Sequence, residues 1–243
     1  MDNSIKIFST PFKLAEKFAE EMVRMINISS GRKKTFTIAL SGGSTPELLF
    51  TQIGNHFAGS VTWKDVHLFW GDERCVPPDN IESNYGMTKR LLIDKLEIPL
   101  CNIHRIMGEN DLHNEIQRYS DEISAFTRSR NGMPVFDLVI LGLGTDGHTA
   151  SIFPGNTDLI TSGKMCDIAF HPVTNQKRIT LTTKLINNAD RVVFLVTGKS
   201  KAPIVEEIIK KSKSALKYPA SFILPSDGSL KWYLDNEAAG LLR

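Results

Sequence analysis

The stretch that decides the fold is FDLVILGLGTDGHTASIFPG, residues 136–155. It begins with an apolar run at 136–141 and passes directly into a glycine-rich loop. A short continuous apolar run that ends at glycine is typical of a strand buried on both faces of a sheet. Three further runs share this pattern: TFTIAL at 35–40, VHLFW at 66–70 and RVVFLVT at 191–197. Strands of this kind predict a parallel sheet.

Helical patterns separate these strands. Thr10-Pro11 precedes apolar residues spaced along one helix face, which predicts a capped helix. Asp111 heads a second clear helix, whose apolar stripe runs from Leu112 to Phe126. Weaker patterns predict a helix from Thr45-Pro46, a helix over 84–96, a short strand over 103–106 and a helix after residue 197.

The alternation of strands and helices continues along the whole chain. Two polar stretches, 127–134 and 154–165, are expected to be loops, and neither is long enough to separate domains. We therefore expect one domain over residues 1–243, of the α/β class. Its sheet would be mostly parallel and Rossmann-like, with helices on both faces.

The composition excludes several classes of protein. The 243 residues carry a net charge of +2, which is too small a basic excess for a nucleic-acid partner. Three cysteines, at 75, 101 and 166, form no CxxC pair and so indicate a reducing compartment rather than a disulfide framework. No apolar run reaches the roughly 18 residues that span a bilayer, and the first residues show no secretory signal. We expect a cytoplasmic protein that does not bind membranes.

The loops after the strands are the expected ligand-binding positions, because parallel sheets bind ligands at the carboxyl ends of their strands. SGGSTP, residues 41–46, follows one strand and opens a helix. Gly42 and Gly43 allow close approach of the backbone, and free N–H groups at a helix start favour an anion. Ser44 and Thr45 would add hydroxyl donors. The alternative is a tight strand-to-helix turn with Thr45 as the N-cap.

Three cationic side chains are further candidates for binding an anion. Arg74 ends GDER at 71–74. The two carboxylates of this segment either form a self-contained ion-pair cluster with Arg74 or orient it toward an anionic substrate. Lys201 lies near a helix start in TGKSK, 197–201, which lacks the first glycine of a phosphate-binding P-loop. Arg178 is either a further cation for that anion or a solvated residue at a strand edge.

The loop GLGTDGHTAS, residues 142–151, carries the candidate for catalysis. It fits the dinucleotide pattern G-x-G-x-x-G, but Pro154-Gly155 stops any following helix within about two turns. Asp146 and His148 stand two residues apart. Histidine titrates near neutrality and suits acid–base catalysis, and a neighbouring carboxylate can fix its tautomer. The alternative is a loop histidine with ordinary hydrogen bonds. The histidines show no metal-binding spacing, so no metal is expected.

Together these segments resemble the 6-phosphogluconolactonase family, which is related to the glucosamine-6-phosphate deaminases. The matching segments are SGGSTP (41–46), GDERCVP (71–77), SNYGM (83–87), residues 136–155, KRITLT (177–182), FLVTGKSKA (194–202) and YPASFILPSDGSLKWYLDNEAA (218–239). The resemblance covers nearly the whole chain. The deaminases look less similar, because their second motif lacks Asp-Glu-Arg and their histidine motif continues differently from Thr149–Pro154.

The resemblance implies hydrolysis of 6-phospho-D-glucono-1,5-lactone to 6-phospho-D-gluconate in the pentose phosphate pathway, without metal or cofactor. His148 would take a proton from the attacking water and return it to the ring oxygen, and Asp146 would orient the imidazole. The implied substrate- and phosphate-binding residues are Gly42, Gly43, Ser44, Thr45, Asp72, Arg74, Asn84, Gly144, Arg178 and Lys201, with a contact from Lys199 left open.

Two other functions stay open from the sequence. The first is an aldose–ketose isomerase or deaminase acting on glucosamine 6-phosphate, and the second is a non-catalytic sugar-phosphate sensor. The presence of both Asp146 and His148 argues against the sensor. No obligatory protein partner is expected.

Overall fold

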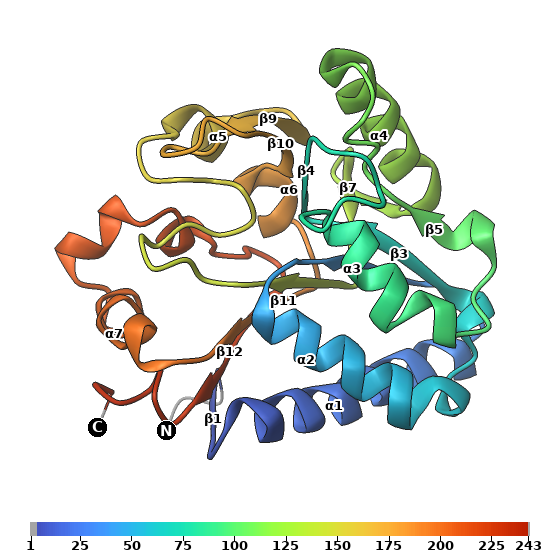
Figure 1. Cartoon of the computed structure of the whole chain (residues 1–243), viewed down its shortest axis with the longest axis horizontal. Helices are drawn as coiled ribbons and strands as arrows, with labels where there is room; N and C mark the ends of the chain where they lie inside the picture. Colours follow the sequence, from blue (N-terminus) through green and yellow to red (C-terminus); the bar gives the residue numbers. More distant parts are fainter. Residues whose placement is uncertain (1–3, 243) are drawn as a thin grey trace.

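Seven parallel strands form the central sheet of the computed structural model, which describes residues 4–242 (Figure 1). Their order across the sheet is β1-β12-β11-β8-β2-β3-β5, and every neighbouring pair is parallel. The strands are β1 Ile5–Phe8, β2 Phe36–Leu40, β3 Val66–Trp70, β5 Ile103–His104, β8 Leu138–Leu141, β11 Arg191–Val196 and β12 Ser229–Asp235. The predicted parallel α/β sheet is confirmed.

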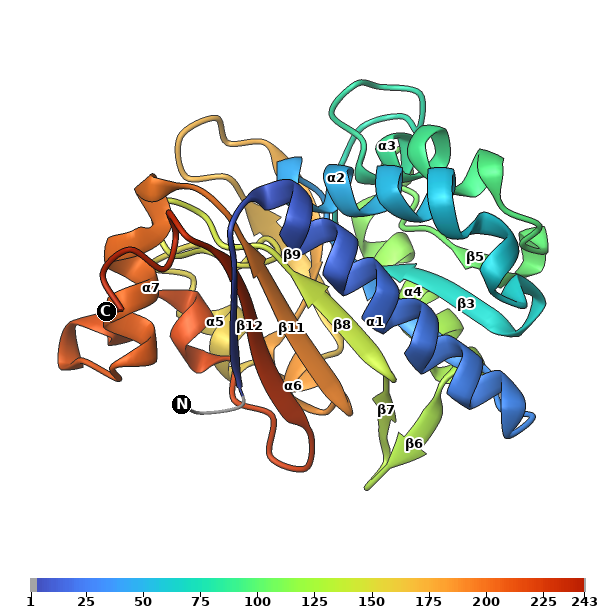
Figure 2. The same ribbon diagram turned by 90° about the horizontal axis from the view of Figure 1, so that it is seen from below.

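Helices cover both faces of this sheet. Figures 1 and 2 show α1 and α2 along one face and α4 and α6 on the other. The helices are α1 Pro11–Gly31, α2 Ser44–Gln52, α3 Asn84–Leu91, α4 Leu112–Phe126, α5 Thr157–Thr161, α6 Thr183–Asn187 and α7 Ala202–Ile209. The buried apolar side chains of the strands and helices form one connected core. None of the helices in residues 4–242 is long and apolar enough to cross a bilayer.

The two clearest helices begin where the sequence predicts. Thr10 caps α1, because its hydroxyl accepts a hydrogen bond from the Lys13 N–H at 3.1 Å. Asp111 caps α4 by accepting from the Asn114 N–H, also at 3.1 Å. The apolar stripe of α1 is buried against the sheet, as helical spacing requires.

Several predicted bounds are wrong in length. The helix expected over 84–96 ends at Leu91, and a single 3₁₀ turn, Ile93–Lys95, follows it. The strand expected over 103–106 is only Ile103–His104. The stretch 154–165, expected to be a loop, contains α5. Short turns such as these depend on tertiary packing more than on the local apolar pattern.

The stretch 127–134 is also more than a loop. It contains β6 Arg128–Arg130 and most of β7 Met133–Val135, which pair as an antiparallel hairpin. Asn131 and Gly132 between them have φ of 53° and 76°. Positive φ at both positions is what a type I′ hairpin turn requires, so the Asn-Gly pair was a usable signal for this hairpin.

A second, three-stranded sheet lies outside the central one. It is antiparallel, in the order β4-β10-β9, with β4 Asp72–Arg74, β10 Lys177–Leu181 and β9 Cys166–Phe170. In the register of β4 and β10, Arg74 is the partner of Arg178. This sheet was not predicted from the sequence, and its pairing brings together two cations that are far apart in the chain.

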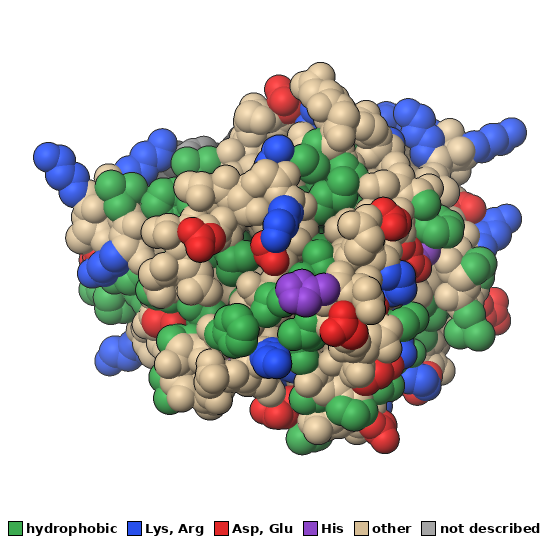
Figure 3. Space-filling model, turned by 90° about the horizontal axis from the view of Figure 1, so that it is seen from above, with side chains coloured by type: hydrophobic (Ala, Val, Ile, Leu, Met, Phe, Trp, Pro, Cys, Tyr) green, Lys and Arg blue, Asp and Glu red, His purple; other side chains and the backbone are tan. Residues whose placement is uncertain are grey.

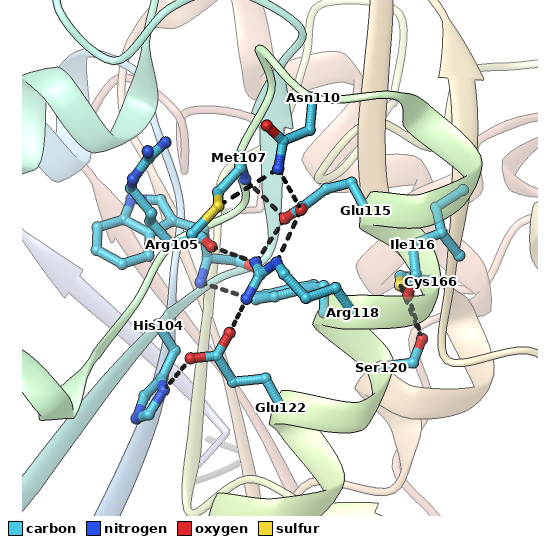
Figure 4. Close-up of polar contacts among 12 residues, drawn as sticks. His104, Arg105, Met107, Asn110, Glu115, Ile116, Arg118, Ser120, Glu122 and Cys166 are labelled. Atoms are coloured by element: carbon cyan, nitrogen blue, oxygen red, sulfur yellow. Dashed lines mark hydrogen bonds and ion pairs between the residues drawn. The ribbon is translucent and has the colours of Figure 1, made fainter.

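A polar cluster attaches α4 to β5, the edge strand of the central sheet. Figure 4 shows Arg118 between Glu115 and Glu122, with Glu122 turned toward His104 of β5. His104 Nδ1 and Glu122 Oε1 are 2.8 Å apart, and the Met107 N–H donates to Glu115 Oε1 at 2.7 Å. Because Glu115 is only 1% exposed, these donors satisfy a carboxylate that burial would otherwise destabilise.

The surface carries charges of both signs. On the face shown in Figure 3, basic and acidic side chains are interspersed among apolar ones, and neither sign covers a broad area. This mixture agrees with the net charge of +2. Local groups of cations, rather than the overall charge, must therefore account for any affinity for anions.

Candidate active site

A cavity of about 310 Å³ opens where the carboxyl ends of β2, β3, β8 and β11 meet the three-stranded sheet. Eleven of the residues that the sequence analysis selected line it: Gly42, Gly43, Ser44, Thr45, Asp72, Arg74, Asn84, Gly144, His148, Arg178 and Lys201. Asp146 does not line the cavity but contacts His148. Lys201 lines it and Lys199 does not. The predicted loops therefore converge on one site.

His148 and Asp146 form a hydrogen-bonded pair. His148 Nδ1 lies 2.6 Å from Asp146 Oδ1, and the same oxygen accepts from the His148 N–H at 3.1 Å. Burial raises the pKa of Asp146, but the hydrogen bonds from His148 outweigh it and hold that pKa at about 2. An ionised carboxylate at Nδ1 keeps the proton on that nitrogen. Nε2 is then the nitrogen that can accept a proton.

The glycines of residues 142–147 shape the loop around this pair. A Cβ at Gly144 would overlap both the His148 imidazole and the Asp146 carboxylate. The Gly144 N–H donates to the His148 carbonyl at 2.8 Å, which closes the loop. Tyr218 packs directly on Gly147. These glycines therefore make room for an acid–base pair. A dinucleotide fingerprint would require a helix directly after the loop, but the next helix is α5.

The SGGSTP segment begins α2 differently from the capped-turn alternative. Gly43 occupies the N-cap position with φ of 103°, a conformation that glycine adopts without strain. Thr45 is not the N-cap: its Oγ1 lies 2.9 Å from Thr197 Oγ1, which ties this loop to the end of β11. No side chain caps the first turn of α2, so its N–H groups are available to an anion.

Two arginines lie beside each other on the wall formed by β4 and β10. Arg74 donates from Nη1 to the Glu82 carbonyl, and Arg178 donates from Nη2 to Gln176 Oε1 at 3.0 Å. The Nε atoms of both arginines are buried without a hydrogen-bond partner in the described structure. Within residues 4–242, no ion pair joins Arg74 to its neighbouring carboxylates, so the self-contained ion-pair interpretation of GDER is wrong. A bidentate anion would satisfy these donors.

Lys201 adds a third positive charge to the cavity. Burial lowers its pKa, and the charge of Asp146 acts in the opposite direction. Burial also lowers the pKa of Arg178, more than the nearby Asp72 carboxylate offsets. The lowered pKa values of Lys201 and Arg178 mean that nearby carboxylates do not fully offset the cost of burying these two cations. The residues that line the cavity carry three cations, Arg74, Arg178 and Lys201, against one carboxylate, Asp72.

Asp72 and Asn84 are buried supports in the cavity wall. Asp72 Oδ2 accepts from the Ser151 hydroxyl at 2.6 Å and lies 4.0 Å from Arg178 Nη1. Asn84 Nδ2 donates to the Asp72 carbonyl at 2.9 Å, and its Oδ1 fills the space that a side chain at Gly42 would need. Ser151 was missed by the sequence analysis. Only the folded position of the Asp72 carboxylate reveals it.

The side chains that could bind a metal ion are dispersed. Within residues 4–242, no group of three or more histidine, cysteine, aspartate or glutamate side chains is placed to hold a metal ion. The cavity is lined by three cationic side chains and several hydroxyls, together with the uncapped start of α2, and these donors suit an anion instead.

Comparison with known proteins shows the family of this chain. The family model described as glucosamine-6-phosphate isomerases/6-phosphogluconolactonase matches residues 9–232. The chain belongs to this family. A 6-phosphogluconolactonase of Haemophilus influenzae is 46% identical over 236 residues, which cover 97% of this chain and 98% of that protein. A second, from Aggregatibacter actinomycetemcomitans, is 44% identical with the same coverage. The solved structure of the 6-phosphogluconolactonase from Trypanosoma brucei has a TM-score of 0.87 at 28% identity, and the match covers 99% of this chain and 98% of that one.

Proposed function

We propose that this chain hydrolyses 6-phospho-D-glucono-1,5-lactone to 6-phospho-D-gluconate, a step of the pentose phosphate pathway. Relatives at 46% and 44% identity over 97% of the chain are 6-phosphogluconolactonases, which supports this reaction. The observation that carries the proposal is the composition of one cavity. It combines an imidazole whose proton is held on Nδ1 with two arginines whose Nε atoms have no hydrogen-bond partner among the described residues.

The cations and the α2 N-terminus hold the substrate. Arg74 and Arg178 present guanidinium groups to an anion, and Lys201 adds a point charge. The N–H groups of residues 43–45 contribute the donors of an uncapped helix start. Together these groups bind the phosphate and orient the lactone ring toward His148.

His148 carries out the proton transfers. Its Nε2 removes a proton from water while the water oxygen bonds to the lactone carbonyl carbon, and the carbonyl oxygen takes the negative charge. Loop N–H groups or a cationic side chain stabilise this oxyanion. When the carbon–oxygen bond of the ring breaks, the imidazolium returns its proton to the ring oxygen, and the carboxylic acid is released as the carboxylate. Asp146 holds the imidazole in place and stabilises its cation.

The test is a lactonase assay with freshly generated 6-phosphogluconolactone. We expect acid production well above spontaneous hydrolysis, and no ammonia from glucosamine 6-phosphate. Acid production at the spontaneous rate would contradict the proposal, and ammonia release would assign the chain to the deaminase branch of its family.

A further inference from the structure

Glu73 is a buried carboxylate that belongs to the site's strand but not to its cavity. It lies on β4 between Asp72 and Arg74, whose side chains line the cavity. Glu73 itself is not part of the lining and is only 2% exposed. Alternation along a strand explains the difference, because neighbouring side chains point to opposite faces. Glu73 takes no part in the proton transfers proposed for His148.

Four donors from two segments satisfy this carboxylate. Oε1 accepts from the Arg74 and Asn84 N–H groups, both at 2.8 Å. Oε2 accepts from the Tyr85 N–H at 2.8 Å and the Ser83 hydroxyl at 3.0 Å. Burial raises the pKa of Glu73, against these backbone hydrogen bonds. Within residues 4–242, no lysine or arginine forms an ion pair with it, so these neutral donors alone hold the buried charge.

The bonds exceed what capping of α3 requires. Ser83 already fills the N-cap role, since its Oγ accepts from the Gly86 N–H at 2.9 Å. Glu73 takes the next free N–H groups of the helix start, but it does so from β4, a separate element. It therefore fixes the strand and the helix relative to each other.

Both segments that Glu73 joins carry substrate-facing side chains. Arg74 and Asn84 each give their backbone N–H to Glu73 while their side chains line the cavity. The Asn84 side chain in turn contacts Asp72 and packs on Gly42 of the anion-binding loop. One carboxylate thus sets the relative position of three walls of the cavity.

We propose that Glu73 is a positioning residue for substrate binding, which holds Arg74 and Asn84 where they meet the phosphorylated substrate. The proposal rests on the proposed lactonase function. Glu73 does not contact His148 or Asp146, so it acts on binding rather than on proton transfer. Loss of one charged hydrogen bond from these side chains would weaken anion binding by about tenfold or more, which corresponds to about 1.5–3 kcal/mol.

Glu73→Gln tests this role. It replaces one of the two accepting oxygens by an NH₂ group, which cannot accept the hydrogen bonds that this oxygen receives. We expect KM for 6-phosphogluconolactone to rise about tenfold, as 1.4 kcal/mol of lost binding would give, while kcat changes less than about twofold. Calorimetry should show 6-phosphogluconate binding weakened by a similar factor, which is a readout that needs no turnover.

The matched control is Asp137→Asn at the opposite end of the sheet. Asp137 directly precedes β8. Its Oδ2 also accepts two hydrogen bonds, from the Thr37 N–H and the Thr37 hydroxyl, both at 2.9 Å. This variant should lower the Tm without changing KM. If Glu73→Gln lowers the Tm but leaves KM and the 6-phosphogluconate Kd at native values, the positioning role is wrong.

A second variant decides the question if Glu73→Gln does not fold. Ser83→Ala removes only the hydroxyl donor to Glu73 and the cap of α3. A several-fold rise in KM with native kcat would support the proposal, and an unchanged KM would overturn it. If the native protein itself shows no lactonase activity, the proposed function fails instead.

Discussion

Removal of the His148 imidazole tests the proton-transfer step. A general base contributes about 10²–10⁴-fold to a rate, or about 3–5 kcal/mol of the barrier. Among the described residues that line the cavity, the Asp72 carboxylate is not ready to replace it, because it already accepts from Ser151 and lies near Arg178. We therefore expect His148→Ala to lower kcat by about 10³-fold with KM nearly unchanged.

The fold should tolerate this change. The His148 side chain is 31% exposed, and its ring packs on Phe153 at a centroid distance of 4.8 Å. We expect it to lose less than about 1 kcal/mol of stability. His171→Ala is the matched control, because His171 packs on the same Phe153 at 5.1 Å and does not line the cavity. It should keep native kcat and KM.

The assay is proton release at constant pH, with the spontaneous rate subtracted. Imidazole added to the His148→Ala protein should restore part of the activity, since the substitution leaves a space of that shape. A kcat within about tenfold of native, well short of a full general-base contribution, would remove His148 from the mechanism. An equal loss in His171→Ala would refute the assignment of the base to His148.

Three further predictions concern binding, loop shape and stability. Arg178→Ala and Lys201→Ala should each raise KM about tenfold or more, because each removes a charged hydrogen bond, and kcat should change little. A native KM in both variants would place the phosphate elsewhere. Gly144→Ala should lower kcat nearly as much as His148→Ala in the same assay, because the added methyl overlaps the imidazole; native kcat would contradict the loop geometry. Burial raises the pKa of Glu21, but hydrogen bonds from its lysine and tyrosine partners outweigh this and lower it from 4.5 to about 2. Its contribution to the free energy of unfolding is thus complete above pH 4.5 and lost as the pH falls toward 2, so Glu21→Gln should flatten acid unfolding in that range.

The sequence predicts the central strands well because a strand that is buried on both faces is a continuous run of apolar residues. The apolar runs at 66–70 and 191–197 coincide with β3 and β11 to within a residue. The site follows from the same runs, since parallel strands carry their ligand loops at one edge. This rule predicts His148 and Lys201 as site residues, whereas Arg178 lies within β10 of the antiparallel sheet.

Long-range pairing explains what the sequence did not predict. β4 is only Asp72–Arg74, three charged residues without an apolar pattern, and its strand character comes from pairing with β10 much later in the chain. The adjacency of the two arginines and the burial of Glu73 both depend on that pairing. The alternative in which Thr45 caps α2 is wrong for a local reason, because Gly43 occupies the N-cap position with a positive φ and Thr45 contacts Thr197 instead.

The central claim is that this cavity hydrolyses a lactone that carries a phosphate. The most direct measurement is the ratio of kcat/KM for 6-phosphogluconolactone to that for glucono-1,5-lactone without the phosphate. The unphosphorylated ring brings no anion to the buried Nε atoms of Arg74 and Arg178, which have no hydrogen-bond partner in the described structure, so we expect a ratio of about 10³ or more. A ratio near one would contradict the account, because the cations of the cavity would then contribute nothing to substrate recognition.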